Sequence, residues 1–307
     1  MKRLFSILVC VIFSTTLLSA GGQKDAAPSE SGRIRVFVSI LPQKYFAQRI
    51  GGDNVEVSVM VPPGKSPATY EPSPRQMVTL GKADIFFTIG VAFEKAFLGR
   101  VSSTLKSLRI VSTDQGITKR YLEAHDHDDD EHGDEHGDEH GDEKGEPDPH
   151  IWMDPLLVKE QGAVMRDTFI ELDPGNADAY HEGYREFAAD LDRLHEELAE
   201  ILAPAKGSLL FVYHPAFGYF ADRYGLRQEA IETGGKEPSP AVLEKVVTQA
   251  REEQVKVIFV QPEFPEKSAQ AVADAIDGIV VPVAPLAEDY MENLRSLARK
   301  IAQGILR

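Results

Sequence analysis

The longest periodic segment of the chain, Ala177 to Leu202, constrains the fold more than any other stretch. Its apolar residues recur at intervals of four and three positions, which places them in one stripe along an α-helix. A helix of about 26 residues is ~39 Å long, which is enough to run from one globular lobe to another. A coiled-coil dimer would use the same stripe, but fewer than four heptads are present. The stripe consists of Tyr180, Tyr184, Phe187, Leu191, Leu194, Leu198 and Ile201.

Short apolar strands alternate with amphipathic helices on both sides of this segment, which predicts βαβ units and parallel sheets. We therefore expect an α/β protein with two (β/α) lobes joined by one long rigid helix and a ligand cleft between the lobes. The expected strands are 34–40, 55–61, 84–89, 108–112, 208–213, 255–260 and 278–283. The expected helices are 43–50, 73–82, 92–102, 156–172, 177–202, 217–224, 240–253, 266–276 and 288–305.

The first twenty residues are typical of a secretory signal peptide, with a basic start, an apolar run and small residues around Ala20. We expect cleavage after Ala20 and a periplasmic location. The only cysteine, Cys10, lies in this segment, so the metal ligands of the mature chain would be His, Asp, Glu or water. The expected organisation is a signal peptide at 1–20, a flexible tether at 21–32, an N-terminal lobe at 33–173, a linking helix at 174–203 and a C-terminal lobe at 204–307.

An acidic, histidine-rich tract occupies residues 123–148 and contains fourteen acidic residues and one lysine. It therefore supplies about 13 of the 16 net negative charges, and the nearly neutral remainder has no basic footprint for nucleic acid. Regular glycines and dense charge predict a loop. Imidazoles beside carboxylates are the ligands that Zn²⁺ prefers, although acidic runs are often only solvated linkers. Five of the nine histidines lie here: His125, His127, His132, His136 and His140.

Two histidines outside the tract are the best candidates for a defined site. His150 lies between two Asp-Pro dipeptides, and each proline restricts the backbone before it. His214 directly follows an expected strand of the second half, at the strand edge where α/β proteins bind ligands. Two more histidines, His181 and His195, fall among charged residues of the long helix and are expected to be exposed.

Several motifs together resemble the zinc- and manganese-binding receptors of ABC transporters, the cluster A-I solute-binding proteins. The resemblance covers nearly the whole mature chain and implies one metal ion held between two lobes. It also implies delivery to an ABC permease in the inner membrane, with no reaction catalysed. We expect a monomer. The motifs are VPPGKSPATYEPSPRQM (61–77), ADIFFTIG (83–90), DPHIWMDP (148–155), HPAFGYFADRYG (214–225), KEPSP (236–240), IFVQPEFPEKSA (258–269) and APLAEDYMENL (284–294).

The resemblance implies four metal-ligand positions, of which the second matches His150 and the third His214. A histidine at the third position favours Zn²⁺ over Mn²⁺. The first and fourth positions hold Ala68 and Ala284, neither of which can bind a metal. Three solutions remain open: a nearby carboxylate completes the site, tract histidines complete it, or the cleft binds metal weakly or binds another ligand. The candidate carboxylates are Glu71, Glu237 and Glu263.

Two other functions compete with a zinc receptor. A metal buffer or adhesin would act through the tract histidines alone. A secreted zinc hydrolase would use a two-histidine site with open positions for water and substrate. Against the hydrolase, the chain contains no His-Glu-x-x-His sequence and no nucleophile with a base beside it in sequence.

Overall fold

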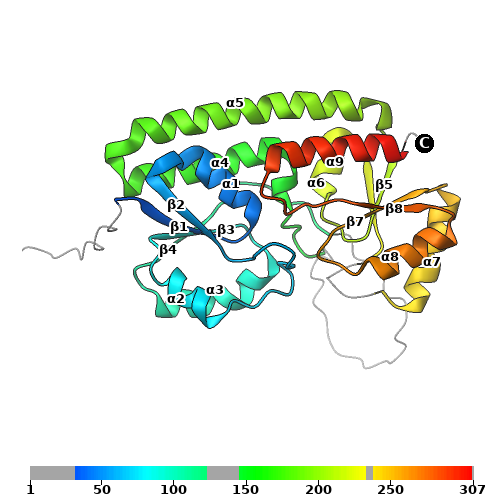
Figure 1. Ribbon diagram of the computed structural model, residues 1–307, viewed down its shortest axis with the longest axis horizontal. Helices are drawn as coiled ribbons and strands as arrows, with labels where there is room; N and C mark the ends of the chain where they lie inside the picture. Colours follow the sequence, from blue (N-terminus) through cyan, green and yellow to red (C-terminus); the bar gives the residue numbers. More distant parts are fainter. Residues whose placement is uncertain (1–31, 123–144, 233–237, 306–307) are drawn as a thin grey trace, which may run out of the picture.

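The computed structural model describes residues 32–122, 145–232 and 238–305, and contains two separate parallel sheets (Figure 1). The first sheet has the strand order β2-β1-β3-β4, and the second has the order β6-β5-β7-β8. All neighbouring strands are parallel. The strands are β1 (Ile34–Val38), β2 (Val55–Val59), β3 (Ile85–Thr88), β4 (Arg109–Ser112), β5 (Leu209–Val212), β6 (Arg227–Ala230), β7 (Val257–Val260) and β8 (Ile279–Pro282).

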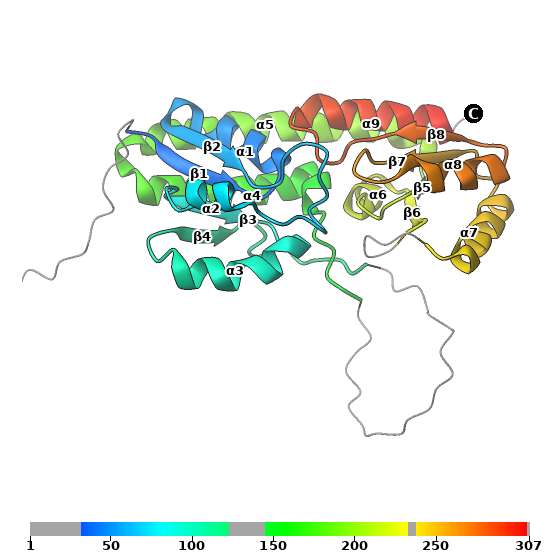
Figure 2. The same ribbon diagram turned by 60° about the horizontal axis from the view of Figure 1, so that its bottom comes forward.

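The helices surround the two sheets, and α5 runs along both lobes with α9 beside it (Figures 1 and 2). The predicted architecture of two parallel-sheet lobes and one long helix is confirmed. No helix in the described part of the chain is long and apolar enough to cross a membrane. The helices are α1 (Leu41–Gly51), α2 (Pro74–Leu80), α3 (Ala92–Thr104), α4 (Pro155–Leu172), α5 (Ala177–Leu202), α6 (Gly218–Tyr224), α7 (Pro240–Glu252), α8 (Glu266–Ala275) and α9 (Tyr290–Ile305).

The apolar stripe of α5 is buried as its spacing predicts, because α1, α4 and α9 pack against it. Gly183 allows the closest approach: a Cβ at this position would lie 2.5 Å from the carbonyl oxygen of Ile50 at the end of α1. The fully buried residues of the stripe are Tyr180, Phe187, Leu191, Leu194 and Leu198. The helix is therefore part of the shared core and connects the two lobes through packed side chains.

Parallel strands bring all of their carboxyl ends to one edge of each sheet, where the connecting loops form binding surfaces. In the first lobe these loops follow β2 and β3, and in the second they follow β5, β7 and β8. Residues of both sets line one common cavity, as the next section describes. The fold thus places a binding site between the lobes, as the sequence predicts.

Two sequence predictions differ from the structure. Strand β6 was not predicted, because its residues, Arg-Gln-Glu-Ala, are mostly polar and lie at the sheet edge. His195 is half-buried instead of exposed, with its Nδ1 3.3 Å from the hydroxyl of Tyr224, whereas His181 is exposed as expected. The predicted signal peptide, nearly all of the tether, the five tract histidines and Glu237 lie outside the described residues.

Candidate metal site

His150 is held in place by Asp148, two residues earlier in the chain. One carboxylate oxygen of Asp148 accepts hydrogen bonds from the backbone N–H of His150 at 2.9 Å and from its ring Nδ1 at 2.7 Å. His150 then leads into a short 3₁₀ turn, Ile151–Met153, which runs directly into α4. The turn is fully buried, so the backbone that carries the histidine is fixed on both sides.

The charge state of Asp148 determines which nitrogen of His150 is available. Burial acts to raise the pKa of Asp148, but His150 and Arg120 outweigh it and hold that pKa below its usual range. The group is therefore a carboxylate and accepts a proton-bearing Nδ1. The lone pair of His150 is left on Nε2, which is the atom that can bind a metal.

His214 has the same arrangement in the second lobe. It follows β5 by two residues, and its Nδ1 pairs with the fully buried carboxylate of Glu232, which follows β6. Gln261 fixes its backbone by donating to the carbonyl of His214 at 2.7 Å and accepting from its N–H at 3.3 Å. The ring of Phe264 stacks on the imidazole at 4.7 Å. Burial lowers the pKa of His214, although Glu232 acts in the opposite direction. The lowered pKa favours the neutral imidazole that metal binding requires.

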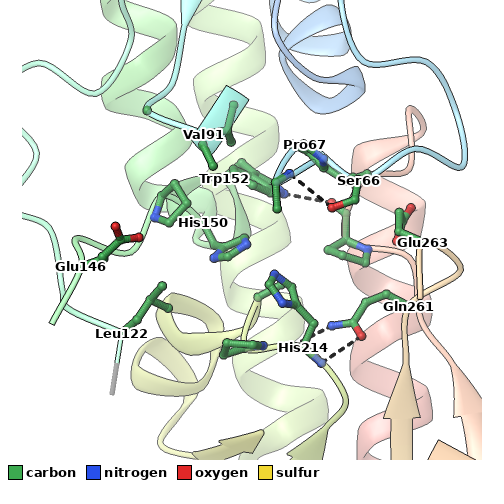
Figure 3. Close-up of a pocket in the computed structure, with 18 of the residues that line it drawn as sticks. Ser66, Pro67, Val91, Leu122, Glu146, His150, Trp152, His214, Gln261 and Glu263 are labelled. Carbon is green, nitrogen blue, oxygen red and sulfur yellow. Dashed lines mark hydrogen bonds between the residues drawn. The ribbon is translucent and has the colours of Figure 1, made fainter. Parts of the chain in front are cut away.

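The two imidazoles meet across the cavity between the lobes. Their ring centroids are 5.2 Å apart and the ring planes cross at 74° (Figure 3). Each Nδ1 is turned to a carboxylate, so the two Nε2 atoms are the free donors of the pair. The cavity has a volume of about 160 Å³, and much of its wall is apolar: Pro67, Ala68, Val91, Trp152, Pro285 and Leu286. The arrangement can hold a small cation between two lobes in a largely apolar setting.

Hydrogen bonds join the segment around His150 to the second lobe. The indole N–H of Trp152 donates to the carbonyl of Pro285 at 2.9 Å, and the hydroxyl of Tyr290 donates to the carbonyl of Trp152 at 2.8 Å. The hydroxyl of Tyr219 donates to the carbonyl of Asp148 at 2.9 Å. The position of one histidine is therefore coupled to the lobe that carries the other.

The remaining candidates lie in different places. Ala68 lines the cavity and offers no donor, whereas Ala284 lines a neighbouring hollow. Glu263 lines both, and Glu71 is exposed and lines neither. Within the described ranges, no three His, Cys, Asp or Glu side chains are already gathered closely enough to hold an ion.

The supporting residues were not found from the sequence. Asp148 lies in a quoted motif, and its spacing of two from a histidine was the available signal. Glu232 had no such signal, because it follows β6, a strand that the sequence does not reveal. Gln261 and Phe264 act through β7, whose position beside β5 follows only from the sheet order.

Comparison with known proteins identifies the family of the chain. A family model described as the periplasmic component A of the zinc-uptake complex, ZnuA, matches residues 36–304. The chain belongs to this family. The resemblance predicted from the motifs is thereby confirmed.

Individual relatives cover most of the chain. The high-affinity zinc uptake system protein ZnuA of Bacillus subtilis (strain 168) is 31% identical over 286 residues, which are 89% of this chain and 83% of that protein. A manganese-binding lipoprotein, MntA of Halalkalibacterium halodurans, is 26% identical and covers 85% of this chain and 81% of its own length. The family thus includes proteins named for each of the two metals.

Solved structures match the fold over the same range. A crystal structure of ZnuA is 37% identical, with a TM-score of 0.79 over 89% of this chain and 99% of that one. A ZnuA deletion mutant with zinc bound is 36% identical, with a TM-score of 0.79 over 89% of this chain and 98% of that one. The periplasmic zinc-binding protein TroA of Treponema pallidum, at 20% identity and a TM-score of 0.77 over 90% and 100% of the two chains, shares the fold.

Proposed function

We propose that this protein is a periplasmic receptor that captures one Zn²⁺ between its lobes and delivers it to an ABC permease in the inner membrane. His150 and His214 are the ligands of this ion. The observation that carries the proposal is the pairing of each Nδ1 with a buried carboxylate, which leaves two Nε2 donors facing one cavity. A cleaved signal peptide at 1–20 would export the chain. Its role is binding and release, with no catalysis.

The donor type supports zinc over manganese. Imidazole nitrogens suit Zn²⁺, whereas carboxylate, carbonyl and water oxygens suit Mn²⁺. The two donors that the fold positions most firmly are both imidazoles. The relatives named for zinc, such as ZnuA of Bacillus subtilis, point the same way.

The five tract histidines are proposed as auxiliary ligands that bind additional metal close to the cavity. The described residues at both ends of the tract support this location. The N–H of Leu122 donates to the carbonyl of Glu146 at 2.9 Å, and both residues line the cavity. A metal buffer that acts through the tract alone is the competing function.

Alanine substitution of each cleft histidine tests the proposal. We use the full mature chain with all five tract histidines changed to glutamine, and measure Zn²⁺ affinity by competition with a chromophoric chelator. We expect His150→Ala and His214→Ala each to weaken binding by more than about 100-fold, beyond the effect typical of outer-shell changes. His195→Gln, on α5 and outside the cavity, is the matched control and should bind as the parent does. Unchanged affinity in both alanine variants would contradict the proposed site.

A further inference from the structure

The two histidines leave the proposed ion short of both donors and negative charge. Two neutral imidazoles fill half of the tetrahedral set of Zn²⁺. The ion carries two positive charges, whereas the positive charge of Arg120, 3.5 Å from Asp148, is already paired with Asp222 at 3.2 Å. The carboxylates of Asp148 and Glu232, both fully buried, supply two negative charges behind the histidines. At least one donor is still needed, and the two imidazoles place no negative charge in direct contact with the ion.

Two of the residues that line the cavity could supply a carboxylate directly to an ion there. Glu146 has a side chain that is 77% exposed, and it already pairs with Lys95 at 3.5 Å. Glu263 is half-buried, and no lysine or arginine among the described residues pairs with it. Burial raises the pKa of Glu263, so water solvates its charge incompletely and a cation beside it would be favourable. Glu263 is the better candidate.

The position of Glu263 is set by the same contacts that fix His214. It lies in the loop after β7, the strand between β5 and β8. Gln261 holds the backbone of His214, and Phe264 stacks on its ring, so the residues on both sides of Glu263 contact the ligand. Glu263 itself is near the rim of the cavity (Figure 3). The fold thus brings this carboxyl-bearing loop to His214 through two independent contacts.

Glu263 has room to turn towards the ion. It lines the cavity and also a neighbouring hollow of about 270 Å³, whose wall includes Ala284. Ala284 adds neither a carboxylate nor a bulky side chain to that wall, and the other carboxylate in it, Glu288, is paired with Lys44 at 2.7 Å. The side chain of Glu263 can therefore move between the hollow and the cavity without displacing the core.

We propose that Glu263 is the third ligand of the ion held by His150 and His214, and that its side chain turns in from the rim when the ion binds. The site is then two imidazoles and one carboxylate, with water in the fourth position. The carboxylate adds a third donor and places a negative charge in direct contact with the ion. This inference rests on the proposed function and adds a ligand to the same site.

Glu263→Gln tests the inference, because glutamine keeps the size of the side chain and removes its charge. We expect the affinity for Zn²⁺ to fall at least about tenfold at an unchanged ratio of one cleft ion per chain, since ligand charge strongly tunes affinity. Glu266→Gln, on the exposed first turn of α8, is the matched control and should bind as the parent does. Equal affinity of the two glutamine variants would overturn the inference.

A crystal structure of the zinc-loaded parent gives a second readout. An oxygen of Glu263 at about 2.0–2.2 Å from the metal supports the inference, and a water molecule in its place overturns it. The histidine variants separate this result from the proposed function. If His150→Ala and His214→Ala abolish binding while Glu263→Gln does not, the receptor site stands and only the third ligand is rejected. If the histidine variants bind normally, the receptor site itself fails.

Discussion

Asp148 and Glu232 orient the rings of His150 and His214, as the proposed metal site requires. Each carboxylate is buried, accepts a hydrogen bond from Nδ1 and so leaves Nε2 as the basic nitrogen. The same residue pattern without these partners would allow either nitrogen to face the cavity. Gln261 adds a second constraint: its side chain forms hydrogen bonds with the N–H and the carbonyl of His214. These bonds fix the backbone of His214, whereas Glu232 orients its ring.

Glu232→Gln is expected to weaken Zn²⁺ binding by about 10–100-fold, because the amide still accepts from Nδ1 but no longer supplies negative charge behind the ligand. The measurement is chelator competition in the background that lacks the tract histidines. Glu229→Gln, in strand β6 just before Glu232 and not among the residues that line the cavity, is the control. If Glu232→Gln binds Zn²⁺ as tightly as Glu229→Gln, the negative charge of Glu232 does not affect the metal affinity of His214.

Glu94, which is not among the residues that line the cavity, makes stability depend on pH. Burial raises the pKa of Glu94 to about 7, although Ser39 and the N–H groups of Gly90 and Ile89 donate to it and act in the opposite direction. The folded protein therefore keeps a proton that the unfolded chain releases above its ordinary pKa of 4.5. The free energy of unfolding is expected to fall as pH rises between about 4.5 and 7, by an amount on the order of a few kcal/mol.

Glu94→Gln isolates this contribution, because glutamine cannot titrate. Thermal unfolding of the metal-free protein at pH 5, 6 and 7.5 measures the stability of both proteins. We expect the difference between parent and variant to shift in favour of the variant as pH increases. The same difference at all three pH values would show that Glu94 is already ionised at pH 5.

At the scale of single elements, α5 depends on one close contact. Gly183→Ala would place a methyl group 2.5 Å from the carbonyl oxygen of Ile50 and 3.0 Å from that of Arg49. The helix would have to move away from α1, and overpacking of this kind costs about 1–3 kcal/mol. We expect a lower free energy of unfolding by denaturant. Gly99→Ala in α3, where the added methyl group meets nothing within 4 Å, should stabilise by about 0.5–1 kcal/mol. Equal effects at the two positions would contradict this account of the packing.

The elements also show what sequence periodicity can predict. α5 has the same bounds as its predicted helix, because a long apolar stripe leaves few alternatives. Seven strands were predicted within about two residues of their ends, since their short apolar runs alternate with helices. Strand β6 was missed because an edge strand of polar residues has no apolar run, and its pairing with β5 arises only in the folded sheet. Glu232 was missed as a consequence.

At the scale of the whole molecule, the sequence predicts a cleft because two βαβ halves flank one helix. His150 and His214 could be placed in that cleft from their motifs and from the strand end before His214. How the lobes contact each other could not be predicted, since these contacts join residues far apart in the sequence, such as Tyr219 and Asp148. Trp152 and Pro285 are one such pair, and Trp152 with Tyr290 is another.

Trp152 makes the state of the cleft measurable, because it is the only tryptophan in the chain. Its ring lies 5.1 Å from that of His150, and its N–H donates to Pro285 in the other lobe. A metal ion on His150 would change the surroundings of the indole, whereas metal held only by the tract would not. We expect tryptophan fluorescence to change on addition of Zn²⁺ and to reach a plateau at one equivalent, both in the parent and without the tract histidines. His214→Ala should remove the change at the same zinc concentration. Unchanged fluorescence while several equivalents of Zn²⁺ bind, with that binding lost together with the tract histidines, would instead indicate a metal buffer.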